Sequence, residues 1–261
     1  MTSGKPLDGA LFIPRFLLRT LLLAGVVLVF YQLLRLTAGP RLFPALPLVA
    51  RRFSTMVLNG QLPYHILVSA RRVFAGLFLS LLVAIPVAVA MSRFPKADKI
   101  LSPLLYLVYP IPKVTFLPVL MLVLGLGDAS KISMIFLIIV FQVIVSLRDA
   151  LRALDRRAFQ AVRAFGGGKL DVARHVVIPA TMPALLSALR ISGGTAVAVL
   201  FIAESFATED GMGFFIMDAW SRVSYADLHC GVLALSLFGL GLFGLIDLAE
   251  WWLCPWQKPM H

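Results

Sequence analysis

Long apolar runs separated by short polar segments most constrain how this chain can fold. The run from Val73 to Met91 carries no charged residue, and the runs 132–147, 183–203 and 228–246 carry at most one each. Because a helix needs about 20 apolar residues to cross a bilayer, these runs predict membrane spans. The chain is 60% hydrophobic and only 14% charged, whereas soluble domains are about a quarter charged. We therefore predict an all-α polytopic membrane protein, with residues 1–261 forming one transmembrane domain whose core covers about 66–252.

About six spans are expected. The first is Thr20 to Leu34, and an amphipathic stretch from Leu46 to Leu58 predicts a helix lying on the interface. The third span, between Ile100 and Gly127, is broken by four prolines and holds a single charge, Lys113. Prolines at membrane depth free backbone carbonyls, which neighbouring protein or a wet cavity must satisfy. This broken span is therefore expected to line a pathway through the membrane.

The distribution of basic residues predicts the orientation of the chain. The segments 92–103 and 148–183 contain three and seven Lys or Arg, and the segments 124–131 and 206–227 contain one each. Short loops rich in Lys and Arg remain in the cytoplasm, so the first two segments and both termini are predicted to be cytoplasmic. Segment 37–65, with its three arginines, departs from this trend. No cleavable signal pattern follows the first apolar run, so we expect that run to stay as an anchor.

The polar segment 148–183 has a helical pattern of its own. Its apolar residues recur every three or four positions, which places them on one helical face; they are Leu151, Leu154, Ala158, Val162 and Phe165. Gly166, Gly167 and Gly168 should end this helix. A second short apolar pattern then runs up to a predicted stop at Ile178-Pro179. Such a segment suits either of two roles, lying on anionic headgroups or contacting a partner in the aqueous phase.

One motif in this segment decides between the two roles. Gln160-Ala161-Val162, followed by Gly166 and then by Ile178-Pro179, resembles the Glu-Ala-Ala…Gly…Leu-Pro motif of ABC importer permeases. In that family the motif forms the coupling helix, which docks into a groove of the ATPase subunit. Gln160 stands where the family has Glu, so the charge is lost although the length and the hydrogen-bonding oxygen are kept. Whether this exchange alters coupling is left open.

The resemblance extends from about Leu42 to Trp252 and is closest to permeases of the sulfonate, nitrate and taurine type. The residues that carry it are Ser69 and Arg72, Pro110-Ile111-Pro112-Lys113, Gly125 to Lys131, Leu189-Arg190-Ile191, Ala203-Glu204 and Gly211-Met212-Gly213-Phe214. It implies a transport subunit in a bacterial cytoplasmic (inner) membrane that forms the passage for a small anion and is not itself an enzyme. The implied partners are a second copy of the chain, two ATPase subunits that bind the ATP and Mg, an extracytoplasmic binding protein and the lipid bilayer.

Two sets of candidate site residues follow. The ATPase-coupling set comprises Arg157, Gln160, Ala161, Arg163, Phe165, Gly166 and Gly167. The translocation-pathway set comprises Pro112, Lys113, Gln142, Ser192, Thr195 and Glu204. Lys113 is either a counter-charge for an anion or a partner of carbonyls freed by its prolines. Glu204 either faces the mouth of a cavity or caps an interface, and Gln142, Ser192 and Thr195 also suit hydrogen bonds between packed helices.

Other functional classes find little support in the sequence. The four His and two Cys are not at metal-ligand spacing, and no catalytic group, metal site or cofactor site is predicted. The formal net charge of +11 comes largely from basic residues beside apolar runs, where they set orientation, so nucleic-acid binding is not expected. The alternative is a secondary transporter driven by an ion gradient. That class predicts an inverted repeat with buried carboxylates, and we find no such repeat. A membrane scaffold is disfavoured by the proline-broken span.

Overall fold

The computed structural model describes residues 9–257, and every regular element in that range is helical. The helices are α1 (Gly9–Ala38), α2 (Leu46–Leu58), α3 (Gln61–Arg93), α4 (Pro95–Val108), α5 (Leu117–Leu124), α6 (Asp128–Arg152), α7 (Arg156–Ala164), α8 (Lys169–Val172), α9 (Ile178–Glu204), α10 (Met212–Ser221) and α11 (Tyr225–Leu253). A 3₁₀ turn, Lys113–Phe116, precedes α5, and a π turn, Ala173–Val177, joins α8 to α9. Among the described residues, four helical stretches are long and apolar enough to cross a membrane. They are α3, α6, α8 to α9, and α11.

The predicted break in the third span is present. Helix α4 and the segment Lys113–Leu124 meet at an angle of 83° and together can form a fifth span. A shorter apolar stretch, Gly25–Ala38, lies within α1. These elements confirm the all-helical polytopic class, with five to six spans. The amphipathic helix predicted at Leu46 to Leu58 is also found, with the same bounds.

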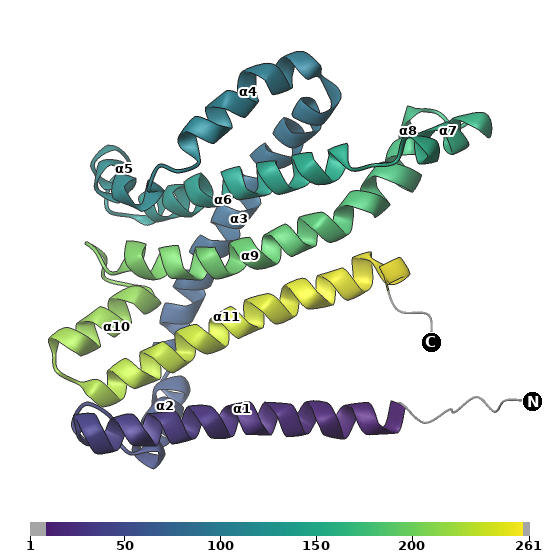
Figure 1. The fold of residues 1–261 in the computed structure, drawn as a ribbon. Helices are drawn as coiled ribbons and strands as arrows, with labels where there is room; N and C mark the ends of the chain where they lie inside the picture. The colour runs from purple at the N-terminus through teal and green to yellow at the C-terminus, as the bar shows by residue number, and fades with distance from the viewer. Residues whose placement is uncertain (1–8, 258–261) are drawn as a thin grey trace, which may run out of the picture.

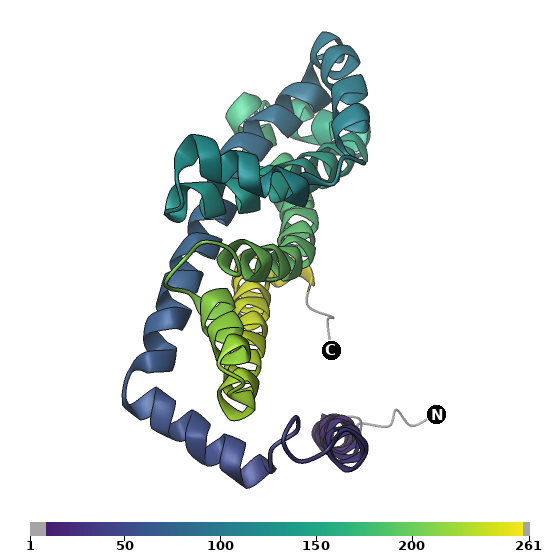
Figure 2. The same ribbon diagram turned by 90° about the vertical axis from the view of Figure 1, so that its left-hand side faces the viewer.

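Helices α3, α6 and α9 supply most of the buried residues of the main core, and α4, α5 and α11 add the rest. Helices α6 and α9 lie side by side, and α3 crosses them (Figures 1 and 2). Ile135 and Ile139 of α6 and Leu200 of α9 are completely or almost completely buried between them. A second cluster, which includes Met56, Leu62 and Phe215, joins α2 and α3 to α10 and α11. Helix α1 lies apart from α6 and α9, and its Tyr31 ring contacts His229 of α11.

Gly76 of α3 lies directly against Ile135 of α6. A Cβ atom at this position would lie 2.5 Å from Cγ2 and 2.8 Å from Cβ of Ile135. We expect Gly76→Ala to destabilise the protein by roughly 1–3 kcal/mol because the added methyl group overpacks this contact. Gly239→Ala in α11 is the matched control, since nothing lies within 4 Å of its added Cβ and alanine favours a helix by up to about 1 kcal/mol.

Thermal unfolding of the detergent-solubilised variants measures this difference. The unfolding midpoint should fall for Gly76→Ala and stay level or rise for Gly239→Ala. Equal midpoints would show that the two helices separate at Gly76 without cost.

The sequence pattern predicts one helix that contains both Leu151 and Phe165. This prediction is wrong, because the chain forms two separate helices here. Helix α6 ends at Arg152 and α7 begins at Arg156. The break is stabilised by Asp155, whose Oδ1 accepts a hydrogen bond from the Arg157 amide at 2.9 Å. An Asp at this position satisfies one of the free amides in the first turn of a helix.

The predicted stop at Ile178-Pro179 is also wrong. Helix α9 begins at Ile178 and continues to Glu204, with Pro179 in its first turn and Pro183 inside it. The π turn Ala173–Val177 ends just before Pro179, and such local adjustments let a helix continue past a proline. The helical path therefore runs from Lys169 to Glu204, and Glu204 ends it as predicted.

The two ends of the molecule differ in their charged contacts. At the end that carries α7, Arg152 of α6 pairs with Asp98 of α4 at 2.5 Å, which brings the basic segments 92–103 and 148–183 together. The start of α1 and the end of α11 lie toward the same end (Figure 1). At the opposite, α10 end, Arg52 Nε lies 2.7 Å from Asp227 Oδ1. The hydrogen bond and the charge of Asp227 raise the pKa of Arg52, so one arginine of segment 37–65 is neutralised by a carboxylate from another helix.

Candidate functional site: an ion-pair network and an exposed coupling segment

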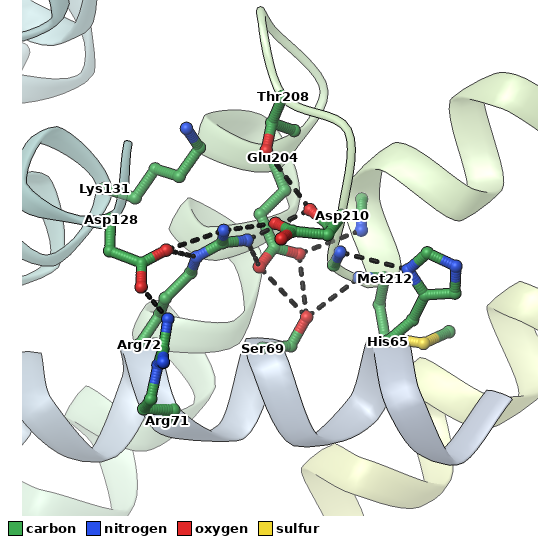
Figure 3. A network of polar contacts seen from close by, with 12 residues as sticks. His65, Ser69, Arg71, Arg72, Asp128, Lys131, Glu204, Thr208, Asp210 and Met212 are labelled. Carbon is green, nitrogen blue, oxygen red and sulfur yellow. Dashed lines mark hydrogen bonds and ion pairs between the residues drawn. The ribbon is translucent and has the colours of Figure 1, made fainter. Parts of the chain in front are cut away.

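A network of ion pairs at the α10 end is centred on Arg72 of α3 (Figure 3). Its Nη1 donates to Glu204 Oε1 at 2.7 Å, and its Nε donates to Asp128 Oδ1 at 2.7 Å. Its Nη2 donates to Asp210 Oδ1 at 2.5 Å, and Arg71 also contacts Asp128. The side chains of Arg72 and Glu204 are only 3% and 0% exposed. One guanidinium therefore joins the last residue of α9, the first residue of α6 and the segment before α10.

The remaining bonding capacity of Glu204 is also used. Its Oε2 accepts from the Ser69 hydroxyl at 2.8 Å and from the Gly213 amide at 3.0 Å. The Ser69 hydroxyl in turn accepts from the Met212 amide at 2.8 Å. A carboxylate bonded to amides at the start of α10 is also favoured by the dipole of that helix. Nearby, His65 Nδ1 accepts from the Gly211 amide at 3.1 Å.

Two glycines allow α10 to approach Glu204. Gly211 has a φ of +103°, and a Cβ on it would lie 2.3 Å from Cδ of Glu204. A Cβ on Gly213 would lie 2.6 Å from both Glu204 Cβ and the Phe201 carbonyl oxygen. The Gly211-Met212-Gly213 motif therefore serves close packing against the carboxylate.

The charges of the network balance. Buried Lys131 donates through Nζ to the carbonyl oxygens of Leu126 at 2.5 Å and Gly127 at 3.2 Å. With Lys131 included, the bases are Arg71, Arg72 and Lys131, and the carboxylates are Asp128, Glu204 and Asp210. An open cavity of about 550 Å³ adjoins the network, and its lining includes Asp128, Glu209 and Asp210. This arrangement can hold helices together, but it offers an anion no uncompensated positive charge.

Sequence reasoning placed only Glu204 of this network among the site residues. Ser69, Arg72, Asp128, Lys131 and Gly211 entered as residues of the family resemblance, without a role. A signal was available, because ionisable residues at the ends of apolar runs are costly and usually find partners. The sequence did not show that they would be partners of one another.

The predicted pathway residues bond to different partners. Ser192 Oγ donates to Gln142 Oε1 at 3.1 Å and so links α9 to α6, whereas Thr195 bonds the Ile191 carbonyl of its own helix. Lys113 Nζ donates to the Tyr109 carbonyl at 2.9 Å, in the bend that also contains exposed Pro112. This bond matches the local interpretation of Lys113. The role of these residues in a pathway stays a prediction.

The predicted coupling residues do lie together, on the connection between α6 and α9. This connection, residues 153–177, contains α7 and is called the coupling segment; it projects at the end of the molecule opposite the Arg72 network (Figure 1). Of the seven, only Gly167 is half-buried and the other six are exposed. Phe165 is 93% exposed and Leu170 of α8 is 80% exposed. Gly166 has a φ of +81°, and the Gly167 amide donates to the Val162 carbonyl at 3.0 Å, so the chain turns sharply after α7. Large apolar side chains held on an exposed turn are typical of a protein-contact surface.

Comparison with known proteins identifies the family of this chain. The model of the family described as binding-protein-dependent transport system inner membrane component matches residues 76–256. The taurine transport system permease protein TauC of Escherichia coli is 28% identical over 200 residues, covering 77% of this chain and 73% of that protein. A putative aliphatic sulfonates transport permease protein, SsuC of Bacillus subtilis, is 24% identical over 243 residues, covering 92% and 88%.

The fold also matches a solved structure. It resembles a chain in the crystal structure of an amino acid ABC transporter with histidines, with a TM-score of 0.53 and 18% identity, covering 76% of this chain and 97% of that one. The family match covers more than half of the chain and includes α6, the coupling segment, α9 and α10. This chain therefore belongs to the inner membrane components of binding-protein-dependent transport systems and is a non-catalytic permease subunit of an ABC transporter.

Proposed function

We propose that this chain forms the translocation pathway of an ATP-driven importer for a small anion, of the taurine or sulfonate class. In this proposal two copies of the chain pair with two ATPase subunits, which bind the ATP and Mg, and receive substrate from an extracytoplasmic binding protein. The observation that carries the proposal is the exposed turn at Phe165 and Gly166. This turn lies in the stretch of chain that leads from α6 to α9, two helices that pack in the core.

The mechanism follows from this connection. Closure of the ATPase subunits around ATP would displace the coupling segment, and α6 and α9 would carry the displacement into the membrane as a rigid-body movement. The α7 end is then cytoplasmic, together with both termini, and the α10 end is extracytoplasmic. The concentration of Lys and Arg in segments 92–103 and 148–183 supports this orientation.

The choice of substrate rests on the relatives, two of which are described as taurine and aliphatic sulfonate permeases. ATP-dependent uptake of labelled taurine tests it. Competition by unlabelled alkanesulfonate or nitrate is the expected result, and competition by an uncharged compound alone would contradict the anion class.

Co-purification tests the ATPase contact. We expect the tagged chain, extracted in mild detergent, to retain a partner that hydrolyses ATP. The double variant Phe165→Ser/Gly166→Ala should weaken retention by at least about 30-fold, because truncating a central aromatic anchor commonly costs 2 kcal/mol or more. Leu58→Ser is the matched control, since Leu58 is 87% exposed but lies on α2, far from α7.

Two results would contradict the proposal. Equal loss in both variants would mean that exposed apolar residues act only through general stability. Absence of any ATPase, with uptake that collapses when a proton or sodium gradient is removed, would identify a secondary transporter instead.

A further inference from the structure

The two helices joined by the coupling segment meet again at their far ends, in the Arg72 network. Helix α6 begins at Asp128 and runs to the coupling segment. Helix α9 begins after that segment and ends at Glu204. At 1.5 Å per residue each helix is roughly 40 Å long. The bond between Ser192 and Gln142 links them along their length, and both contribute to one core. A displacement at Phe165 is therefore carried by a packed pair of helices whose other ends are held by one guanidinium.

We infer that Arg72 is a positioning residue that forms a fixed pivot for α6 and α9. It holds the far ends of both helices against α3 while their coupling ends move, and it stays bonded throughout the transport cycle. This inference rests on the proposed role of the coupling segment. It assigns the network a mechanical task rather than contact with the substrate.

The burial of the network argues that it is a pivot and not a gate. No buried side-chain nitrogen or oxygen in the described part of the chain lacks a hydrogen-bond partner, and Glu204 is completely buried. Opening the network would leave that carboxylate, which is itself shielded from water, without a counter-charge. This is far more costly than separating exposed charges. A gate that opens in every cycle is better built from weak contacts.

The chemistry of Arg72 suits a pivot that joins several segments. Its planar guanidinium bonds Asp128, Glu204 and Asp210 in different directions at once. The ammonium of a lysine is a single point charge and cannot reproduce this fixed fork. The adjoining cavity is unsuited to an anionic substrate, because its lining includes the carboxylates of Asp128, Glu209 and Asp210, whereas the side chain of Arg72, the basic residue in that lining, is only 3% exposed.

Cross-linking across the network tests whether it opens. Leu126, before α6, and Glu209, after α9, line the same cavity, and neither side chain makes a network bond. We would join Leu126→Cys to Glu209→Cys with a bis-maleimide in the complete transporter. Cys230 and Cys254 are buried, and burial raises the pKa of the Cys254 thiol, so both should react slowly.

The expected result is that cross-linked protein keeps the ATP-driven uptake of the two single-cysteine controls treated in the same way. Loss of uptake only in the cross-linked double variant would show that the network opens, and would overturn the inference.

Charge removal tests whether the pivot is needed. Arg72→Met/Glu204→Gln removes both charges, so no buried charge remains unpaired between them. The control is Arg52→Met/Asp227→Asn, which removes an ion pair at the same end that joins α2 to α11. We expect Arg72→Met/Glu204→Gln to retain the ATPase in co-purification. The ratio of substrate taken up to ATP hydrolysed should fall about tenfold or more, as when a coupling free energy is lost. The control should keep the parent ratio.

These experiments distinguish a failure of the pivot from a failure of the proposed function. An unchanged ratio in Arg72→Met/Glu204→Gln, with the ATPase retained, overturns the pivot but leaves the proposed function standing. Failure of the unaltered chain to retain any ATPase overturns the proposed function and the pivot together.

Discussion

Replacing Arg72 alone with methionine should prevent most of the chain from accumulating in folded form. The substitution leaves Glu204, which is completely buried, without its counter-charge. Removing one partner of a buried ion pair costs about 3–5 kcal/mol, a large part of the 5–15 kcal/mol that holds a typical domain folded. The measurement is the amount of monodisperse protein extracted from membranes, followed by its unfolding temperature.

Two controls make this result specific. Adding Glu204→Gln to Arg72→Met should restore much of the folded yield, because the uncompensated charge is then gone. Arg222→Met should have a much smaller effect, since the side chains of Arg222 and its partner Asp218 are 52% and 34% exposed and exposed ion pairs contribute about 1 kcal/mol or less. A folded yield for Arg72→Met equal to that of the parent would contradict this prediction and mean that Glu204 finds another partner.

Gly167→Ala should abolish most ATP-driven uptake while leaving the protein in the membrane. A Cβ on Gly167 would lie 2.6 Å from Val162 Cγ1 and 2.7 Å from the Val162 carbonyl oxygen. The backbone oxygen cannot move without unwinding the end of α7, so the turn that presents Phe165 must shift. An overpacking cost of roughly 1–3 kcal/mol lowers the population of the native turn by about five- to 150-fold. Initial rates of uptake, normalised to the protein in the membrane, measure the effect.

The adjacent glycine supplies the control. A Cβ on Gly168 would meet only Asp171 Oδ2, at the ordinary distance of 3.7 Å, so Gly168→Ala should keep most of the uptake. Equal losses in the two variants would show that any side chain in this glycine run is harmful, and that the shape of the turn at Gly167 is not the cause.

Much of the fold could be predicted from local patterns. Apolar runs located the spans, and the prolines between Pro103 and Pro118 predicted the broken one, since both signals lie within a few turns of chain. The helix Leu46–Leu58 followed from its amphipathic pattern. The coupling residues were predicted together because they are neighbours in sequence, and the structure exposes nearly all of them.

The omissions lie mainly in contacts between residues distant along the chain. Val73 begins the uncharged run that predicts the second span, whereas helix α3 already begins at Gln61, because the polar side chains of His65, Ser69 and Arg72 find partners in α9, α10 and the segment between them. Pro179 is a stop signal in a regular α-helix, and the sequence does not show the π turn Ala173–Val177 that lets the helix continue past it. No spacing in the sequence shows that Asp128 and Glu204 meet at one arginine.

The distance between Arg72 and Glu204 along the chain has a consequence for biosynthesis. They are 132 positions apart, and a ribosome adds roughly 5–20 residues per second. Arg72 therefore emerges about ten seconds before its buried partner exists. During that interval its guanidinium must reach toward the headgroups, as long basic side chains do at membrane surfaces. Helix α3 should thus enter the bilayer first with Val73 near the boundary, and settle at its final depth only when the end of α9 arrives.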